Sequence, residues 1–157
     1  IQYFDPELGK SYIPYVVETS IGLDRMFLSV LSHAFCKEKL ENGESRSVLK
    51  IPAFLAPIKA AILPLTKKDG MPEKARAIMK SLHTNFNCQY EEKDSIGKRY
   101  RRQDAIGTPF CITIDHQTLE DDTITIRDRD TMQQNRISIA KIHSIVSEKT
   151  DIANFLN

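Results

Sequence analysis

The sequence predicts an α/β protein, with a mixed five-stranded sheet flanked by three helices over residues 51–157 and a strand and helix before it. Strand-like segments alternate with segments of helical periodicity, and the last strands follow one another closely. The composition, with 41% hydrophobic and 27% charged residues, suits a folded core. A length of 157 residues corresponds to about one domain.

Residues 1–50 predict one strand and one helix. The run 12–18 is rich in β-forming residues and follows a turn at Gly9-Lys10, so it is expected to be a strand. Apolar residues recur at helical spacing from Leu23 onward, which predicts a helix. The polar run 38–47, which contains an Asn-Gly pair, is expected to be an exposed loop.

The remaining residues predict the order strand, helix, strand, helix, three strands, helix. Strands are expected at 59–65, 88–91, 110–115, 123–128 and 134–139. The first helix begins around Gly70, with Pro72 early in its first turn, and the second begins after Ser95 and ends at Gly107. Ser138 is expected to cap the last helix, with Ile142, Ile145, Val146 and Ile152 facing inward. An acidic turn is expected at 120–122. Parallel crossovers followed by an antiparallel hairpin make the sheet mixed.

The composition also excludes several classes of protein. A net charge of +1 argues against nucleic-acid binding by charge alone. No apolar run approaches the roughly 20 residues of a membrane helix, so no membrane partner is expected. Three cysteines without a CxxC pair and four scattered histidines predict neither a disulfide framework nor a metal site. Cys88 and Cys111 are expected to be buried thiols. Because the cysteine pattern argues against disulfides, the protein is expected to be cytoplasmic.

The densest basic segment is KDSIGKRYRRQD at 93–104, with five basic and two acidic residues. In a helix, Lys98, Arg101 and Arg102 share one flank, while Ile96 and Tyr100 face the sheet. Arginine recognises phosphate through its planar donor fork, and a tyrosine supports base stacking. RNA binding and a solvated helix face both remain open on these residues alone.

Two further segments carry charged residues at regular spacing. In TITIRDRDT, at 123–131, strand alternation places Arg127 and Arg129 on one face. These arginines either read bases or pair with neighbouring aspartates, and the spacing favours pairing. In ETSIGLDR, at 18–25, an arginine follows small residues in the first turn of a helix, which suits phosphate, although a tight turn with a salt-bridged Arg25 is the alternative.

Together these segments resemble the class II aminoacyl-tRNA synthetases. ETSIGLDR resembles their third motif, whose terminal arginine binds ATP. The runs LAPIKAAILPLTKKDGMPEKA, SIGKRYRRQDAIGTPFCITID and TITIRDRDTMQQ resemble the class IIa anticodon-binding domain, in the form found in homodimeric glycyl-tRNA synthetases. The resemblance extends from about Tyr12 to the last helix, with the motifs in the family's order and spacing.

The resemblance implies a division into two parts. Residues 1–50 are expected to be the end of a class II catalytic domain, and 51–157 the anticodon-binding domain. The first and second class II motifs are missing, so this polypeptide alone is expected to be inactive. The intact enzyme is expected to be a cytoplasmic homodimer that uses ATP with Mg²⁺ to form glycyl-adenylate and then glycyl-tRNA-Gly. No cofactor is expected to be bound to this part.

The resemblance also implies roles for individual residues. Arg25 matches the catalytic arginine that binds the ATP phosphates, Glu18 the glutamate that binds the glycine ammonium, and Ser20 the serine beside it. Thr19 stands where the family often has proline. The expected anticodon contacts, which can instead pair with Asp104, Asp128 or Asp130, are the basic residues Lys98, Arg99, Arg101, Arg102, Arg127 and Arg129.

Three alternatives remain. One is a non-catalytic, synthetase-like subunit that binds tRNA, and the presence of Glu18, Ser20 and Arg25 speaks against it. Another is a class IIa enzyme for threonine, proline or histidine, which Glu18 and Ser20 disfavour. The last is a stand-alone metabolic enzyme, for which the sequence offers no nucleophile–base pair or metal cluster.

Overall fold

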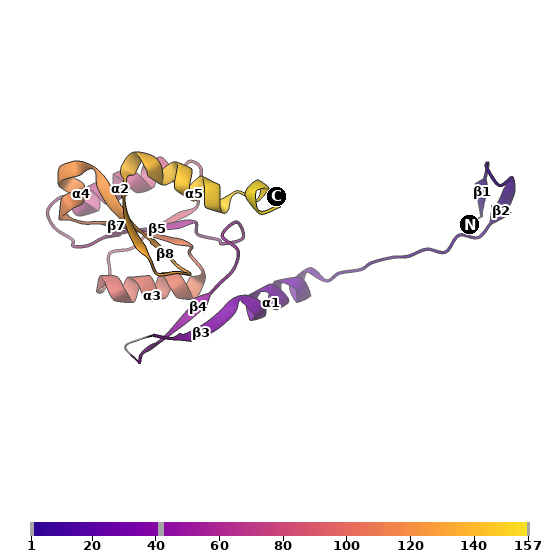
Figure 1. Ribbon diagram of the computed structural model, residues 1–157, viewed down its shortest axis with the longest axis horizontal. Coiled ribbons are helices and arrows are strands. Elements are labelled where there is room, and N and C mark those ends of the chain that lie inside the picture. The colour runs from indigo at the N-terminus through magenta and orange to yellow at the C-terminus, as the bar shows by residue number, and fades with distance from the viewer. Residues whose placement is uncertain (1, 41–42, 157) are drawn as a thin grey trace.

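The computed structural model describes residues 2–40 and 43–156. Figure 1 shows an α/β domain at one end and a long N-terminal extension. The strands are β1 (Tyr3–Asp5), β2 (Lys10–Tyr12), β3 (Phe35–Lys39), β4 (Ser45–Leu49), β5 (Ala60–Pro64), β6 (Cys88–Tyr90), β7 (Phe110–Ile114), β8 (Thr123–Asp128) and β9 (Gln134–Ser138). The helices are α1 (Leu23–Ala34), α2 (Met71–Leu82), α3 (Ile96–Ile106), α4 (His116–Asp121), the short 3₁₀ helix η1 (Ile139–Lys141), α5 (Ile142–Thr150) and α6 (Ala153–Leu156).

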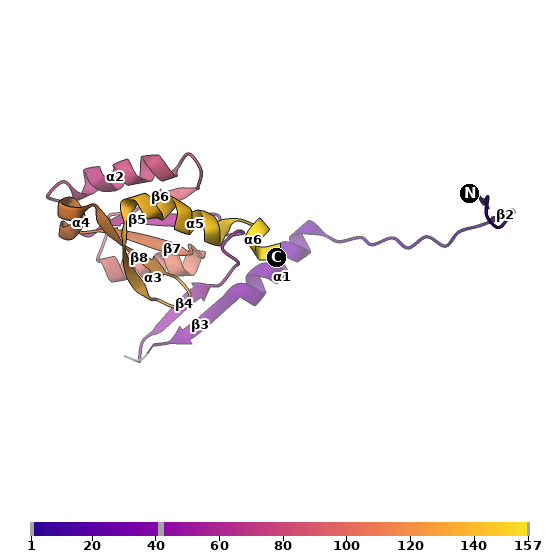
Figure 2. The ribbon, with the colours of Figure 1, turned by 45° about the horizontal axis from the view of Figure 1, so that its top comes forward.

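Five strands form the predicted mixed sheet, in the order β6-β5-β7-β8-β9. Strand β5 pairs in parallel with β6 and with β7, while β7, β8 and β9 are antiparallel neighbours. The β5-α2-β6 and β6-α3-β7 crossovers place α2 and α3 on opposite faces of the sheet (Figure 2). The predicted mixed sheet flanked by three helices is therefore confirmed.

Apolar side chains cover both faces of this sheet. Helices α2 and α5 pack on one face, where Ile62, Ile112 and Val146 are fully buried. On the other face, Ile96 and Tyr100 of α3 pack against a smaller cluster of sheet residues. Cys88 and Cys111 are buried in these two clusters, as predicted for ordinary core thiols.

Two predictions for residues 1–50 are wrong. The run 12–18 is not a strand: the β1–β2 hairpin ends at Tyr12, and residues 13–22 are exposed and belong to no helix or strand. The run 38–47 is not a loop throughout, since β3 and β4 pair as an antiparallel hairpin. Its polar composition concealed a strand alternation in which Arg46 and Val48 point inward while Ser45 and Ser47 point outward.

Three smaller differences lie in the α/β domain. Ser138 precedes the 3₁₀ helix η1 and makes no side-chain cap hydrogen bond, so it does not cap α5 as expected. The segment 120–122 was expected to be an acidic turn, but it forms the end of a short helix, α4. This helix forms because Asp115 and Thr118 cap its start reciprocally. Ile152 was expected to face inward, yet it is 53% exposed. Helix α5 ends at Thr150, so Ile152 lies beyond the periodic face that buries Ile142 and Val146.

The β3–β4 hairpin packs against α3, on the side of α3 away from the sheet. Figure 1 shows α3 lying between the sheet and this hairpin. Gly107, which ends α3 with a φ of +85°, permits the close approach: an added Cβ would lie 3.1 Å from the backbone oxygen of Leu49 and from the Ile51 side chain. The hairpin is thus part of the same packed unit as the α/β domain.

Most of the N-terminal part lies apart from this unit, but the end of α1 contacts it, since Ala34 is buried beside Ile51 and Ala56. Helix α1 continues directly into β3, and its residues Leu23, Phe27 and Leu28 are each at least 65% exposed. The extended segment 13–22 separates α1 from the β1–β2 hairpin (Figure 1). Within the described ranges, no helix has the length and apolarity needed to cross a membrane.

Candidate nucleic-acid interface

Helix α3 carries four of the six predicted RNA contacts, and the structure separates them by burial. Lys98, Arg101 and Arg102 lie on the expected flank, exposed or half-exposed, whereas Arg99 is only 2% exposed. The Arg99 Nη1 atom donates to the carbonyl oxygens of Pro64, at 2.6 Å, and Glu91, at 3.2 Å. Burial lowers the pKa of Arg99. Its guanidinium acts as an internal tie, meaning that its hydrogen bonds link the ends of β5 and β6 inside the protein.

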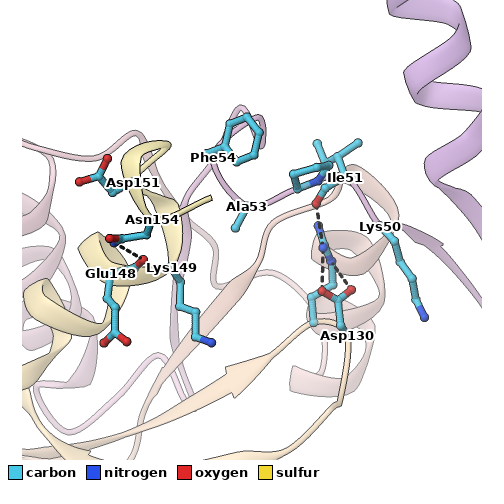
Figure 3. Close-up of a pocket in the computed structure, with 11 residues that line it drawn as sticks. Lys50, Ile51, Ala53, Phe54, Asp130, Glu148, Lys149, Asp151 and Asn154 are labelled. Atoms are coloured by element: carbon cyan, nitrogen blue, oxygen red, sulfur yellow. Dashed lines mark hydrogen bonds and ion pairs between the residues drawn. The ribbon is translucent and has the colours of Figure 1, made fainter. Parts of the chain in front are cut away.

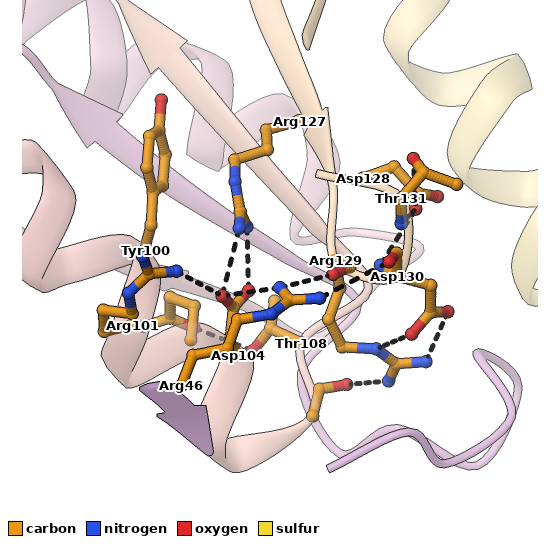
Figure 4. A network of polar contacts seen from close by, with 12 residues as sticks. Arg46, Tyr100, Arg101, Asp104, Thr108, Arg127, Asp128, Arg129, Asp130 and Thr131 are labelled. Atoms are coloured by element: carbon orange, nitrogen blue, oxygen red, sulfur yellow. Dashed lines mark hydrogen bonds and ion pairs between the residues drawn. The ribbon is translucent and has the colours of Figure 1, made fainter. Parts of the chain in front are cut away.

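Arg127 is also buried, and it belongs to an ion-pair network around Asp104 (Figure 4). Its Nη1 and Nη2 donate to the two Asp104 carboxylate oxygens at 2.8 and 3.0 Å. Burial opposes the charge of Arg127, but the hydrogen bonds and attraction of Asp104 outweigh it and raise the Arg127 pKa. The Arg127 Cζ atom lies 4.8 Å from the centre of the Tyr100 ring, and the Tyr100 hydroxyl forms a hydrogen bond with the Thr113 hydroxyl. Tyr100 therefore makes its contacts inside the protein.

Arg129 is 3% exposed and ties three segments together. Its guanidinium donates to the carbonyl oxygens of Gly107, at 2.8 Å, and Ile51, at 2.9 Å, and it binds both carboxylate oxygens of Asp130. Arg127 and Arg129 share an inward face, as strand alternation predicted. Pairing with a neighbouring aspartate of TITIRDRDT describes Arg129, which binds Asp130, whereas Arg127 pairs with Asp104 of α3.

Arg46 is the member of this network that sequence reasoning missed. Its side chain is fully buried and donates to Asp104 Oδ2 at 3.0 Å, to the Arg129 carbonyl at 2.9 Å and to Glu38 at 2.7 Å. The signal was present in β4, where Ser45-Arg46-Ser47-Val48 alternates, but a charged residue at an inward position is read from sequence as solvent-facing.

Arg101 lies at the rim of the same network (Figure 4). Its side chain is 38% exposed, and its Nη1 lies 3.7 Å from Asp104 Oδ2, beyond hydrogen-bond distance. Arg101 is therefore attracted to Asp104 but not held by it, so several of its donors remain available to a ligand.

Arg102 has more partners than Arg101. It donates to the Glu91 carboxylate at 2.6 Å, to Asp94 at 2.9 Å and to the Lys93 carbonyl at 2.8 Å. These carboxylates raise the Arg102 pKa. Because two acidic groups neutralise Arg102, the flank presents Arg101 and the exposed Lys98 as its least compensated positive charges.

A separate cavity of about 610 Å³ lies between the segment after β4, the β8–β9 connection and the end of α5 (Figure 3). It is lined by Lys50, Ile51, Pro52, Ala53, Phe54, Arg129, Asp130, Glu148, Lys149, Asp151 and Asn154. Three basic and three acidic side chains face it, and Arg129 and Asp130 are paired with each other. This balance of charge gives the cavity no preference for a phosphate group.

The predicted catalytic residues lie outside the packed unit. Glu18 and Ser20 are exposed in the extended segment, and Arg25 is exposed in the first turn of α1. The structure brings none of the three together with the basic flank of α3. Among the residues the structure describes, no group of three or more histidine, cysteine, aspartate or glutamate side chains is arranged to hold a metal ion.

The α/β domain matches a known protein family. Residues 59–149, more than half of the chain, match the family described as the anticodon binding domain. The chain belongs to this family. The anticodon-binding domain thus comprises the five-stranded sheet together with α2, α3, α4, η1 and most of α5.

Solved structures and curated relatives agree with this assignment. The fold of the anticodon-binding domain is similar to the RNA binding domain of a threonyl-tRNA synthetase from Cryptosporidium parvum, with a TM-score of 0.58 and 21% identity over 64% of this chain and 25% of that one. Proteins named glycine–tRNA ligase are 51% identical in Clostridium tetani and 52% in Chlorobaculum tepidum. These matches include 96% and 95% of this chain, which spans about a third (32%) of the length of each relative.

Proposed function

We propose that this chain is the tRNA-binding C-terminal part of a glycine–tRNA ligase and that it binds the anticodon region of tRNA-Gly. The identity of about 50% to glycine–tRNA ligases over nearly the whole chain supports the specificity. The observation that carries the binding role is the half-exposed, incompletely paired Arg101 on the basic flank of an anticodon-binding domain.

In this proposal the six predicted RNA contacts have two different roles. Lys98 and Arg101 contact the sugar–phosphate backbone, with Arg102 contributing less because Glu91 and Asp94 already neutralise it. Arg99, Arg127 and Arg129 support this surface from within, through their buried ion pairs and hydrogen bonds. Unpaired anticodon bases are read on their Watson–Crick edges next to this flank.

The catalytic roles belong to the longer protein, which we propose is a cytoplasmic homodimer that uses glycine and ATP with Mg²⁺. Arg25 binds the ATP phosphates, Glu18 binds the glycine ammonium, and Ser20 beside it contributes to the glycine site. All three side chains are exposed, with Glu18 and Ser20 in the extended segment and Arg25 in α1, which is consistent with a site that needs further residues to surround the substrates. We accordingly propose that the chain by itself does not catalyse aminoacylation.

We further propose that the boundary between the two parts lies near Phe35 rather than at residue 51. The packing of β4 against α3 and the burial of Arg46 beside Asp104 support this placement. In this division α1 is the last catalytic element, and the β3–β4 hairpin belongs to the tRNA-binding unit.

The test is a titration of the chain with tRNA-Gly and with an anticodon-substituted tRNA-Gly at two salt concentrations. We expect tighter binding to the native anticodon and a loss of about tenfold for Arg101→Met, with a smaller loss for Arg102→Met. Lys80→Met, an exposed charge removed from α2 on the opposite face of the sheet, is the matched control. Equal binding to both tRNAs would contradict anticodon recognition, and an unaffected Arg101→Met would contradict the assigned surface.

A further inference from the structure

The buried Arg46 and the half-exposed Arg101 compete for the same carboxylate oxygen. Asp104 is fully buried, and its Oδ1 accepts from Arg127 at 2.8 Å. Its Oδ2 accepts from Arg127 at 3.0 Å and from Arg46 at 3.0 Å. An ionised carboxylate oxygen offers about two lone-pair sites, so Oδ2 is fully used.

This saturation explains the geometry of Arg101. Its Nη1 lies 3.7 Å from Oδ2, close enough for attraction but too far for a hydrogen bond. One turn of helix separates Arg101 from Asp104, a spacing at which an exposed pair would ordinarily close. Here the acceptor is occupied from the interior, and the Arg101 guanidinium stays at the surface with unfilled donors.

We propose that Arg46 is a positioning residue for RNA binding: by occupying Asp104 from the β3–β4 hairpin, it keeps Arg101 available to tRNA. Arg46 itself is fully buried and does not touch RNA. Its effect passes through Asp104 to Arg101, so the hairpin controls the charge presented by α3. This inference rests on the proposed function, in which Arg101 contacts the RNA backbone.

Removing Arg46 frees one lone pair of Asp104 Oδ2. The Arg101 Nη1 is then expected to move from 3.7 Å to about 3 Å and form a direct hydrogen bond. A guanidinium held in this way has fewer donors for phosphate and a neutralised charge. Binding of tRNA therefore weakens, and the salt dependence of binding decreases as if one phosphate contact were lost.

The experiment is a double-mutant cycle with Arg46→Met and Arg101→Met in this chain, titrated with a synthetic anticodon stem-loop of tRNA-Gly. We expect Arg101→Met to weaken binding about tenfold and Arg46→Met to weaken it several-fold. The double variant is expected to bind no more weakly than Arg101→Met, and both single variants to lower the slope of log K against log salt by about one. Amide hydrogen exchange in β5 and β7 shows that each variant retains the sheet.

The outcomes separate the two proposals. If Arg101→Met binds like the unsubstituted chain, the proposed RNA surface is wrong. If Arg101→Met weakens binding but Arg46→Met does not, or if the two losses simply multiply in the double variant, the positioning role of Arg46 is wrong. Arg46→Gln, which keeps a neutral donor at this position, replaces Arg46→Met if the methionine variant does not fold.

A measurement on the unsubstituted chain needs no variant. NMR of the arginine side chains reports whether each guanidinium rotates freely. We expect Arg46 and Arg127 to be rotationally restricted in the free chain, and Arg101 to become restricted only when the stem-loop is added. Restriction of Arg101 before RNA is added would overturn the inference, because it would show that Asp104 already holds it.

Discussion

Asp104 is the acceptor on which the interior of the tRNA-binding unit depends, and Asp104→Asn tests this directly. The carboxylate is fully buried and accepts three hydrogen bonds from Arg127 and Arg46. Three charge-assisted hydrogen bonds at about 1.5–3 kcal/mol each set an upper bound on the stability lost in Asp104→Asn. The loss is smaller than this bound because the amide oxygen of asparagine still accepts hydrogen bonds. Removing one partner of a buried ion pair costs about 3–5 kcal/mol, because the guanidinium charges are left uncompensated.

We therefore expect Asp104→Asn to lower the free energy of unfolding by about 3–5 kcal/mol, measured by urea denaturation followed by circular dichroism. Asp69→Asn is the control, since Asp69 is exposed and asparagine tolerates its φ of 62°, and its effect is expected to stay within about 0.5 kcal/mol. Adding Arg127→Met to Asp104→Asn is expected to cost less than the sum of the two single changes. A loss below about 1 kcal/mol for Asp104→Asn would refute this account of the network.

Three further predictions concern individual residues. Gly107→Ala is expected to destabilise the chain by at least about 1–2 kcal/mol in urea denaturation because of its positive φ, whereas Gly97→Ala, where a Cβ meets nothing within 4 Å, is expected to be neutral or stabilising. The ion pair with Arg136 lowers the pKa of Asp115 to about 2, so its stabilisation is complete above the unfolded pKa near 4 and is lost as pH falls toward 2; the gap in unfolding free energy between the unsubstituted chain and Asp115→Asn should shrink below pH 4, and a constant gap would contradict this. Burial raises the pKa values of the two core cysteines to about 11 and about 12, so mass spectrometry should find the half-exposed Cys36 alkylated first at pH 8, and equal labelling of all three would contradict the packing.

The mixed sheet was predictable because its elements carry strong local signals. Strand β5 is an apolar run that ends in Pro64, β7 is an apolar run preceded by Gly107 and Pro109, and α2 has an apolar stripe and Pro72 in its first turn. The β3–β4 hairpin was not predictable in this way. Its inward positions include a charged residue, Arg46, two of whose partners, Asp104 and Arg129, lie 58 and 83 positions away along the chain.

The proposed RNA surface also combines features that are local in the sequence with features that depend on the fold. Residues at 98, 101 and 102 share a flank because of the helical period alone. Whether each arginine faces RNA or the interior depends on which carboxylates the fold brings near it. Asp104 and Arg127 meet across 23 positions, and Arg102 meets Glu91 across 11.

The sequence by itself determined the family, the order along the chain of the five sheet strands and of α2, α3 and α5, and the basic flank of α3, because periodicity, turn residues and motifs are local properties. Only the tertiary structure decided that Arg99, Arg127 and Arg129 are internal ties, that Arg46 joins them, and that Arg101 is left half-exposed. The physical reason is that burying an arginine requires acceptors from distant segments, and a linear pattern does not show which of those acceptors are already occupied.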